Sequence, residues 1–593
     1  MKETKTETAL PEYGEPYCVH DHCLCLAKTV KRQTIYVPLC NCAPYIASEL
    51  TVFENGETTR QYRIAGFDRD GNPLPEVDVP AKEFGALKWM DNAWPAACAK
   101  TAAASVEKHI EYAVKTTGDK AEHRYVYSYT GWTDLGGKYS FLLPGNSDYE
   151  VILRGKQTGY AMASECSAAA IDVLFGMLLA DRLPQEVIYP CLALVFLSPL
   201  NEFLRRASYE PKFILALVGR TGSMKSTLAA LLLSFFGKFT ATDLPMSFRD
   251  TANSLLYNAA ALKDVLACVD DFHPSTRKDS DDMNKSMQML ARAYGDRAPR
   301  ERLTSDIRIR DTPQPRGNLI VTAEFPPDIG ESGAARLFIV ETPRGGMDLE
   351  MLSYFQRHAH EGVLMQCMYG YLSWLQSSFL SSEETVSRFV STLENRYVTL
   401  RTQWISVLRK KKLTPHNRLP DTLACLSIGF HTMLWFLQSR GILNNDNRKA
   451  YLQRFDEILE VHAVNQCVAL RTEKPTVIFV RKLIAMIESG QAALLDADHP
   501  GIEIPKGFIG YEDEHFYYLC FEEAHKRVKQ MCDTQHEAFG ISSKALAKQL
   551  AADGLIEVSG DGKNTRTYRF GSVSKRVMFL KKEEAEKIMC DEE

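Results

Sequence analysis

The chain has 593 residues, which is too long for a single hydrophobic core, so several domains are expected. Hydrophobic residues make up 45% of it, as in ordinary globular proteins, and the net charge of −5 excludes nucleic-acid binding driven by overall charge. The amino terminus does not resemble a signal peptide, and the longest apolar run that we recognise, residues 168–180, is interrupted by Asp172. We therefore expect a cytoplasmic protein that does not enter a membrane.

In chain order, the pattern predicts a multidomain α/β protein. Its expected parts are a disordered tail (1–16), a β-rich N-terminal domain (17–160), a helical linker (161–209), a core with a parallel α/β sheet (210–345), a helical lid region (346–474) and a C-terminal region (475–593). At the end of the chain, a helix (542–553) precedes a strand (554–558), a Gly-Asp-Gly turn and two further strands (566–570 and 577–579). This order is typical of a winged helix.

The most specific motif follows a short apolar strand at residues 213–218 and precedes a helix. It consists of Gly219, Arg220, Thr221, Gly222, Ser223, Met224, Lys225, Ser226 and Thr227. A loop of this kind, known as Walker A, directs backbone N–H groups and a helix N-terminus at the phosphates of ATP. Lys225 is expected to reach the β- and γ-phosphates, and the Ser226 hydroxyl to bind Mg²⁺. Met224 stands where the second glycine of the motif is usual.

A second apolar strand ends in two carboxylates, Asp270 and Asp271. We expect Asp270 to hold the Mg²⁺ shell and Asp271 to orient or deprotonate the attacking water. Most motors have Glu at the second place. The shorter Asp271, together with Met224, leaves open a protein that binds ATP but hydrolyses it slowly.

Two further residues complete the predicted catalytic set. Thr322, at the end of a third strand, is placed to sense the γ-phosphate, with Glu324 as a supporting group. Arg336 precedes a fourth strand and is a candidate arginine finger, which stabilises transition-state charge across a subunit interface. An ordinary surface ion pair is the alternative for Arg336.

Basic residues between the second and third strands suggest a hairpin that contacts DNA. Arg302, Arg308 and Arg310 flank its turn and would bind phosphates without reading sequence, although a solvated hairpin has the same pattern. Further basic candidates are residues 409–412, for which a solvated loop is the alternative, and Lys563, Arg566 and Arg569 in the wing, for which a solvated β-hairpin is the alternative. Arg418 is a candidate second sensor by position alone.

The cysteines between Cys18 and Cys42 invite a zinc site, but they form no C-x₂-C pair. A C-x-C pair in a strand places both thiols on one face of a sheet, where they pack as small apolar groups. We therefore predict reduced, structural cysteines.

Several motifs together resemble a helicase family of phages and mobile elements. They are Tyr129-Thr130-Gly131-Trp132, residues 139–145, residues 251–254, Asp270 to Pro274, Glu324 and Arg336-Leu337. The whole is similar to the self-loading replicative helicases of staphylococcal cassette elements, which are MCM-like AAA+ rings. MCM-type loops also tend to lack the glycine before the lysine. The resemblance covers residues 17–345 best.

This resemblance implies an AAA+ ATPase core, a homohexamer with ATP between subunits, and single- and double-stranded DNA as partners. It also implies replication of a mobile element, together with other replication proteins of that element. The leading hypothesis is an ATP- and Mg²⁺-dependent DNA helicase. The alternatives are an ATPase that loads or remodels a replication partner, and an ATP-binding, DNA-binding factor with weak hydrolysis.

Overall fold

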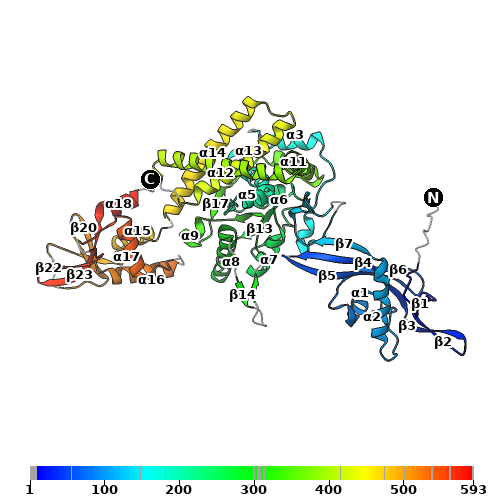
Figure 1. Cartoon of the computed structure of the whole chain (residues 1–593). Helices are drawn as coiled ribbons and strands as arrows, with labels where there is room; N and C mark the ends of the chain where they lie inside the picture. Colours follow the sequence, from blue (N-terminus) through cyan, green and yellow to red (C-terminus); the bar gives the residue numbers. More distant parts are fainter. Residues whose placement is uncertain are drawn as a thin grey trace.

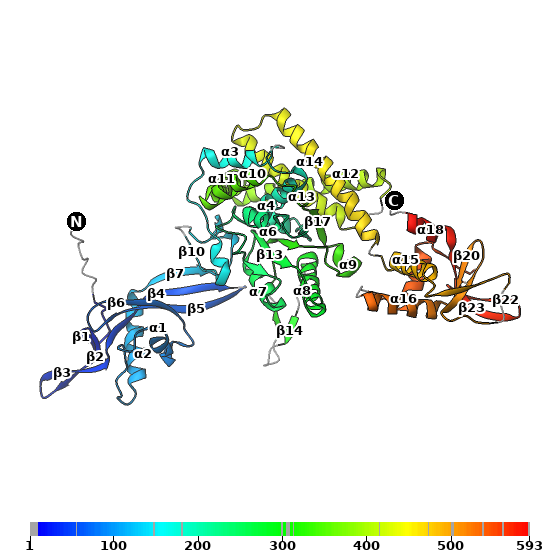
Figure 2. The ribbon, with the colours of Figure 1, turned by 180° about the vertical axis from the view of Figure 1, so that it is seen from behind.

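A computed structural model of the chain has three parts in a row, with the N-terminal domain and the C-terminal region at opposite ends of a central body (Figures 1 and 2). It describes residues 10–54, 56–145, 149–179, 182–297, 301–303, 309–311, 314–413, 416–472, 474–499, 503–535, 539–559 and 562–590, of which 301–303, 309–311, 471–472 and 590 are described by backbone alone. Residues 1–9 of the expected tail lie outside this set. Tyr13 and Gly14, which belong to the expected tail (1–16), make tertiary contacts: Tyr13 donates a hydrogen bond to the Pro44 carbonyl, and the Gly14 N–H donates to the Thr116 hydroxyl.

The N-terminal domain is built on a five-stranded sheet of order β10-β7-β4-β5-β6 and a three-stranded sheet β1-β2-β3. In β4 the side chains alternate between buried and half-buried, as expected for a strand that packs one face on a core. The strands are β1 (Tyr17–His20), β2 (Cys23–Val30), β3 (Gln33–Cys40), β4 (Cys42–Glu54), β5 (Glu57–Asp68), β6 (Pro73–Pro80), β7 (Glu122–Tyr127), β8 (Gly131–Asp134), β9 (Tyr139–Leu142) and β10 (Glu150–Val151); the helices are η1 (Phe84–Ala86), α1 (Lys88–Ala93), α2 (Val106–Thr116), η2 (Thr117–Lys120) and η3 (Gly155–Gly159).

The central body contains a parallel five-stranded sheet of order β12-β13-β16-β11-β17. All five residues of β11 are buried, which is typical of a central parallel strand covered on both faces. Because β16 lies between β11 and β13, residues after these three strands meet at one edge of the sheet. The elements are β11 (Ile214–Val218), α6 (Lys225–Leu233), β12 (Met246–Ser247), α7 (Ala252–Ala261), β13 (Leu266–Phe272), α8 (Arg277–Asp296), β14 (Glu301–Leu303), β15 (Ile309–Asp311), β16 (Asn318–Ala323), α9 (Gly330–Ala334) and β17 (Leu337–Glu341).

Helices that precede this sheet in the sequence and helices that follow it pack into the same large core. They are α3 (Ala168–Gly176), α4 (Gln185–Leu197), η4 (Ser198–Leu200), α5 (Asn201–Arg206), α10 (Leu349–His360), α11 (Val363–Phe379), α12 (Glu383–Lys410), α13 (Leu419–Ser439) and α14 (Asn445–Thr472). Within the described residues, one helical stretch, Gln185–Arg206, is long and apolar enough to span a membrane. The expectation that residues 168–180 are the longest apolar run is therefore wrong. Its apolar window is 94% buried inside the protein, which is the environment of a core helix.

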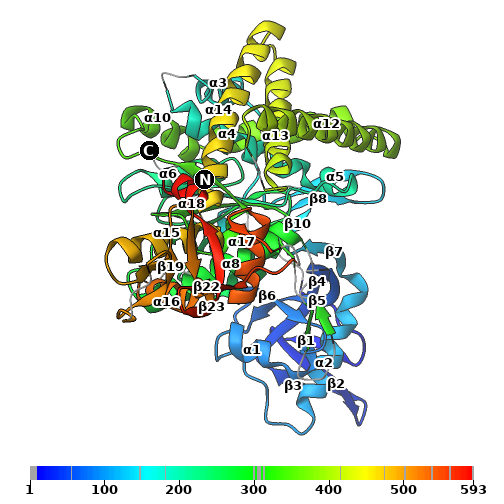
Figure 3. The ribbon, with the colours of Figure 1, turned by 90° about the vertical axis from the view of Figure 1, so that its left-hand side faces the viewer.

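The C-terminal region, which faces the viewer in Figure 3, has its own hydrophobic core. Residues 542–553, predicted as a helix, contain α17 (Ser543–Ala552), and the predicted strand 566–570 coincides with β22 (Arg566–Phe570), which pairs with β23 (Val573–Lys581). The predicted strand 554–558 shortens to β21 (Ile556–Glu557), because only this dipeptide pairs with β23. The sequence did not indicate the rest of the sheet, which contains β18 (Ala493–Asp496), β19 (Phe508–Glu512) and β20 (Phe516–Leu519); the remaining helices are α15 (Pro475–Glu488), α16 (Phe521–Gln535) and α18 (Lys582–Cys590).

Candidate active site

The predicted phosphate-binding loop lies between β11 and α6. Gly222 has φ +85°, and Met224, the N-cap of α6, has φ +64°. A non-glycine residue in this left-handed region costs about 1 kcal/mol, so Met224 takes a glycine-like conformation at some cost. Its side chain is half-buried and packs against the main core. Met224 therefore replaces the missing glycine in backbone geometry and adds packing.

Gly219 is fixed by close contact with the residue that follows β17. A Cβ at Gly219 would lie 2.3 Å from the Thr342 carbonyl oxygen, which is far inside van der Waals contact. The Thr342 hydroxyl donates to the Val218 carbonyl at 3.1 Å and lies 3.1 Å from the Ser223 hydroxyl. Thr342 and the buried Ser223 thus hold the loop from beneath. The sequence analysis did not identify Thr342, because its contact depends on β11 and β17 being neighbours.

Lys225 begins α6 and turns back over the loop. Its ammonium donates to the carbonyl of Gly219 at 2.5 Å and to that of Arg220 at 3.2 Å. Partial burial lowers the pKa of Lys225, and the nearby carboxylates of Glu324, Asp270 and Asp271 oppose this shift. The ammonium is therefore held at the mouth of the loop, where an anionic ligand would add to its few partners.

Asp270, Ser226 and Thr322 come together at the carboxyl edge of the sheet. One oxygen of Asp270, Oδ1, accepts hydrogen bonds from the Ser226 hydroxyl at 2.8 Å and from the Thr322 hydroxyl at 2.5 Å. Thr322 is itself the acceptor for the Asp271 N–H at 3.0 Å. A hydroxyl and a carboxylate at this distance are hard oxygen donors that suit Mg²⁺ bound with nucleotide phosphates.

The Asp271 carboxylate has a partner outside this cluster. Its backbone has φ +68°, at the place where the pairing of β13 with β16 shifts register. Its carboxylate forms an ion pair with Arg249 at 3.0 Å, and the two side chains are 40% and 79% exposed. The predicted general base is therefore held by a solvent-exposed arginine that the sequence analysis did not identify. A pair this exposed is weak enough to exchange for another partner.

Glu324 faces the loop from the end of β16. Its carboxylate accepts a hydrogen bond from the Thr221 hydroxyl and lies 2.5 Å from Nδ1 of His273. The hydrogen bond from Thr221 is the main cause that lowers the pKa of Glu324, so the group is held ionised. Glu324 was expected to play a supporting part, and His273 was not identified. A cavity of about 270 Å³ joins these groups; it is lined by Thr221, Gly222, Met224, Lys225, Ser226, Thr227, Asp271, Phe272, Thr322, Ala323 and Glu324.

Arg336 lies apart from this cavity. Ile214 and Leu337 are neighbours in the parallel strands β11 and β17, so Arg336 is at the amino edge of the sheet. Since β11 has five residues, that edge is roughly 17 Å from the loop. The Arg336 guanidinium donates to Asp296 at 2.8 Å and to the Ser332 hydroxyl at 2.8 Å. Arg336 therefore cannot serve the predicted nucleotide site of its own chain in this arrangement.

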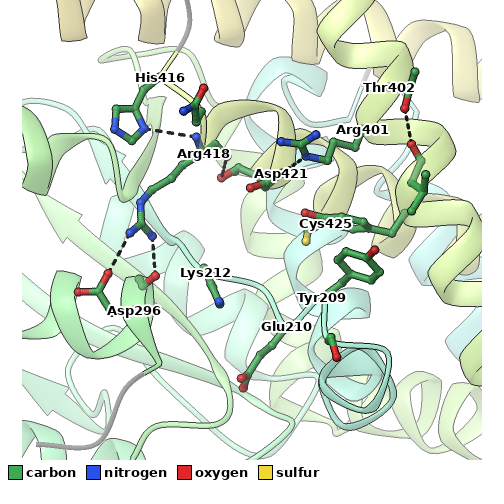
Figure 4. A pocket seen from close by; sticks show the side chains of 16 residues that line it. Tyr209, Glu210, Lys212, Asp296, Arg401, Thr402, His416, Arg418, Asp421 and Cys425 are labelled. Atoms are coloured by element: carbon green, nitrogen blue, oxygen red, sulfur yellow. Dashed lines mark hydrogen bonds and ion pairs between the residues drawn. The ribbon is translucent and has the colours of Figure 1, made fainter.

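Arg418, named as a sensor by position alone, lies beside Arg336. It donates to the same oxygen of Asp296 at 2.9 Å and to the Gly295 carbonyl at 2.5 Å. Figure 4 shows Arg418 in contact with Asp296 at one side of a cavity of about 940 Å³, which is lined by residues of α8, α12 and α13. Two guanidinium groups thus share one carboxylate.

The predicted DNA-contacting hairpin is present in backbone outline. Arg302 in β14 and Arg310 in β15 are directly opposed in an antiparallel pair, and the hairpin projects from the central body beside α8 (Figure 1). Arg308 lies outside the described residues. The backbone pairing agrees with the hairpin expected from the alternating sequence.

The Gly-Trp motif joins the N-terminal domain to the strand that carries Asp270. The Trp132 N–H donates to Asp264 at 3.0 Å, and the Thr130 hydroxyl donates to the Lys263 carbonyl at 2.7 Å. Gly131 has φ +97°, and a Cβ there would lie 2.6 Å from the Lys263 carbonyl oxygen. Lys263 and Asp264 immediately precede β13, so this motif is a structural joint.

We expect the Gly131→Ala variant to be destabilised by about 3 kcal/mol, because it combines backbone strain with a steric clash against backbone. Gly136→Ala is the matched control: Gly136 also has a positive φ, +70°, but has no described atom within 4 Å of an added Cβ. The control should lose about 1 kcal/mol. Urea denaturation of both variants measures the difference, and equal losses would remove the clash from the explanation.

The N-terminal cysteines are mostly buried and unpaired. Cys42 Sγ lies 3.7 Å from Cys40 Sγ, and burial raises the pKa of Cys25 to about 11. Within the described part of the chain, no group of three or more His, Cys, Asp or Glu side chains is arranged to hold a metal ion.

Comparison with known proteins finds the likeness at the level of fold. No protein-family model and no curated protein sequence matches the chain. A solved structure described as "SCCmec type IV Cch - active helicase" aligns over 98% of this chain and 100% of its own, with a TM-score of 0.57 and 13% identity. Weaker similarities, which support no inference, are to the NrS-1 C-terminal region (TM-score 0.27, 10% identity, 71% and 87% coverage) and to a JCV helicase (0.20, 14%, 38% and 69%). The resemblance expected from the motifs is thus confirmed for the fold.

Proposed function

We propose that this chain is an ATP-dependent DNA helicase with an AAA+ core and a C-terminal winged helix. The observation that carries the proposal is the junction of Lys225, Ser226 and Asp270 at one sheet edge, where Ser226 and Asp270 are 2.8 Å apart. A lysine on a phosphate-binding loop, next to a hydroxyl–carboxylate pair, is the set of groups that typically binds a nucleoside triphosphate. The shared fold with a protein described as an active helicase directs the choice of activity.

In this proposal each side chain has one task. Lys225 leaves the Gly219 and Arg220 carbonyls to neutralise the β- and γ-phosphates, and the N–H groups at the start of α6 bind phosphate oxygens. Ser226 and Asp270 would hold Mg²⁺, which supplies charge neutralisation when bound. The Thr322 hydroxyl donates to the Asp270 carboxylate and accepts from the Asp271 N–H. It therefore couples the carboxylate proposed to hold the metal to the residue proposed to activate water.

Asp271 requires a rearrangement before it can act as the base, because Arg249 holds its carboxylate. Glu324, ionised and directed at Thr221, is positioned to sense the occupied loop. The Asp271–Arg249 pair also supports a second candidate, an ATP-binding replication factor with weak hydrolysis.

Arg336 and Arg418 are proposed to complete the nucleotide site of a neighbouring copy. They lie at the sheet edge opposite to their own loop, which supports a head-to-tail ring, and we propose a homohexamer. The hairpin of β14 and β15, carrying Arg302 and Arg310, would contact DNA in the channel of that ring, as would Arg308. Replication of a mobile element, with other proteins of that element, is the proposed biological role.

Strand displacement tests the activity directly. With a forked, fluorescently labelled duplex, we expect unwinding that requires ATP and Mg²⁺ and is absent with a non-hydrolysable analogue. ATP hydrolysis without displacement would favour a loader or remodelling ATPase instead. ATP binding without appreciable turnover would favour the weakly hydrolysing factor.

A further inference from the structure

The β2–β3 hairpin extends beyond the core of the N-terminal domain. Leu24, Leu26 and Leu39 at its base are buried, whereas every residue from 28 to 36 is exposed. Strand pairing continues to the tip, with Lys28 opposite Ile35 and Val30 opposite Gln33. The exposed arm is about 13 Å long and forms the far end of the molecule (Figures 1 and 2).

The turn of this hairpin is made of two residues that are poorly suited to it. Lys31 has φ +50° and Arg32 has φ +67°. Two-residue turns with both central φ angles positive favour Asn-Gly, and a long side chain in this conformation costs about 1 kcal/mol per residue. Both side chains are exposed, so packing does not offset the cost. Backbone strain that packing does not offset is typical of functional sites.

The arm carries positive charge without neutralising partners. Lys28, Lys31 and Arg32 form no ion pair within the described part of the chain. No acidic residue occurs between Asp21 and Glu49 in the sequence. Exposed Val30, Ile35 and Tyr36, at 48%, 49% and 43%, lie behind the cationic tip. A narrow β-ribbon with a cationic end is complementary in charge to a polyanion and is thin enough to enter a major groove.

We infer that the tip of the β2–β3 hairpin binds the phosphate backbone of double-stranded DNA. This inference rests on the proposed function, because it gives the duplex substrate a contact outside the central body. Lys31 and Arg32 each neutralise a phosphate, with Lys28 adding to the field, and the contact is independent of base sequence. The strained turn directs two cations forward from the end of the ribbon, which Asn-Gly would not do.

The Lys31→Asn, Arg32→Gly double variant of the full chain tests the effect of the lost charge on DNA binding without disrupting the fold of the hairpin. It installs the preferred turn dipeptide, so the hairpin is kept or stabilised while two cations are lost. We expect duplex affinity, measured by fluorescence anisotropy, to fall by about tenfold at moderate salt. The slope of log affinity against log salt should decrease by up to about 1.8, the value for two phosphate contacts. DNA-independent ATP hydrolysis should not change.

The Lys88→Asn, Lys138→Asn double variant is the matched control, because it removes the same charge from two exposed positions away from the hairpin. Its duplex affinity and salt slope should equal those of the unmodified chain. An unchanged slope in the hairpin variant, or an equal loss in the control, would overturn the inference. So would retained duplex binding with lost binding to phosphatidylserine vesicles, which would assign the arm to a lipid surface. If the unmodified chain hydrolyses no ATP but the hairpin variant still loses duplex binding, the proposed function fails and this inference stands.

Discussion

The Lys225→Ala variant should lose ATP hydrolysis by at least about 100-fold, because no other cation lines the cavity between α6 and β16 within the described residues. The reason is local: the ammonium of Lys225 is the group that would neutralise the phosphates, and alanine removes its charge from the cavity. The variant should fold, since the lysine is bonded to loop carbonyls that water can satisfy in its absence. Phosphate release at saturating ATP measures the loss.

Lys238→Ala is the control for this prediction. Lys238 is exposed, follows α6 by a few residues and does not line the cavity. Its substitution should leave turnover within about twofold and thermal stability nearly unchanged. Turnover that survives Lys225→Ala at the level of this control would remove the assignment of the nucleotide site.

The sequence was sufficient for the parts of the site that are local in the chain. The loop from Gly219 to Thr227 follows its strand directly, and Asp270 ends a strand whose apolar character is plain. Each strand of the sheet that carries a predicted residue could be recognised because buried parallel strands are continuous apolar runs. Thr322 was predicted as a polar residue after such a run, and it lies 2.5 Å from Asp270.

Contacts that depend on strand order could not be predicted from the sequence. Thr342 braces Gly219 only because β17 is the neighbour of β11, and Arg249 reaches Asp271 only because β12 lies beside β13. The shared partner of Arg336 and Arg418 could not be predicted either, since Asp296 lies 122 residues from Arg418. No local pattern specifies which residues of distant helices converge on one carboxylate.

The end of the chain illustrates a different limit. The helix and the last hairpin could be predicted from apolar periodicity and turn residues, but β18 and β19 were not, although they belong to the same sheet as β23. Their pairing is partly parallel, and Gly510 at the register shift approaches the Tyr518 backbone closely. Short strands of this kind have too few alternating positions to be recognised alone.

Arg336→Ala should slow ATP hydrolysis by on the order of 10³-fold while leaving ATP binding intact, because an arginine finger acts on transition-state charge. If Arg336 had only a structural role, through its ion pair with Asp296, its loss should not slow hydrolysis selectively. Arg336→Lys keeps the charge but loses the planar fork, so it should also bind ATP without restoring full turnover. Nucleotide affinity and steady-state turnover, measured on both variants, distinguish these cases.

Mixing subunits then decides whether Arg336 acts between copies. Asp271→Asn subunits lack the proposed base but keep the finger, and Arg336→Ala subunits have the reverse, so each preparation alone should be nearly inactive. In an equal mixture, about a quarter of head-to-tail interfaces pair an intact finger with an intact base, and turnover should rise toward that fraction of the unmodified rate. A mixture no more active than its components would mean that Arg336 does not act across an interface. Its contact with Asp296, 2.8 Å away and shared with Arg418, would then be structural.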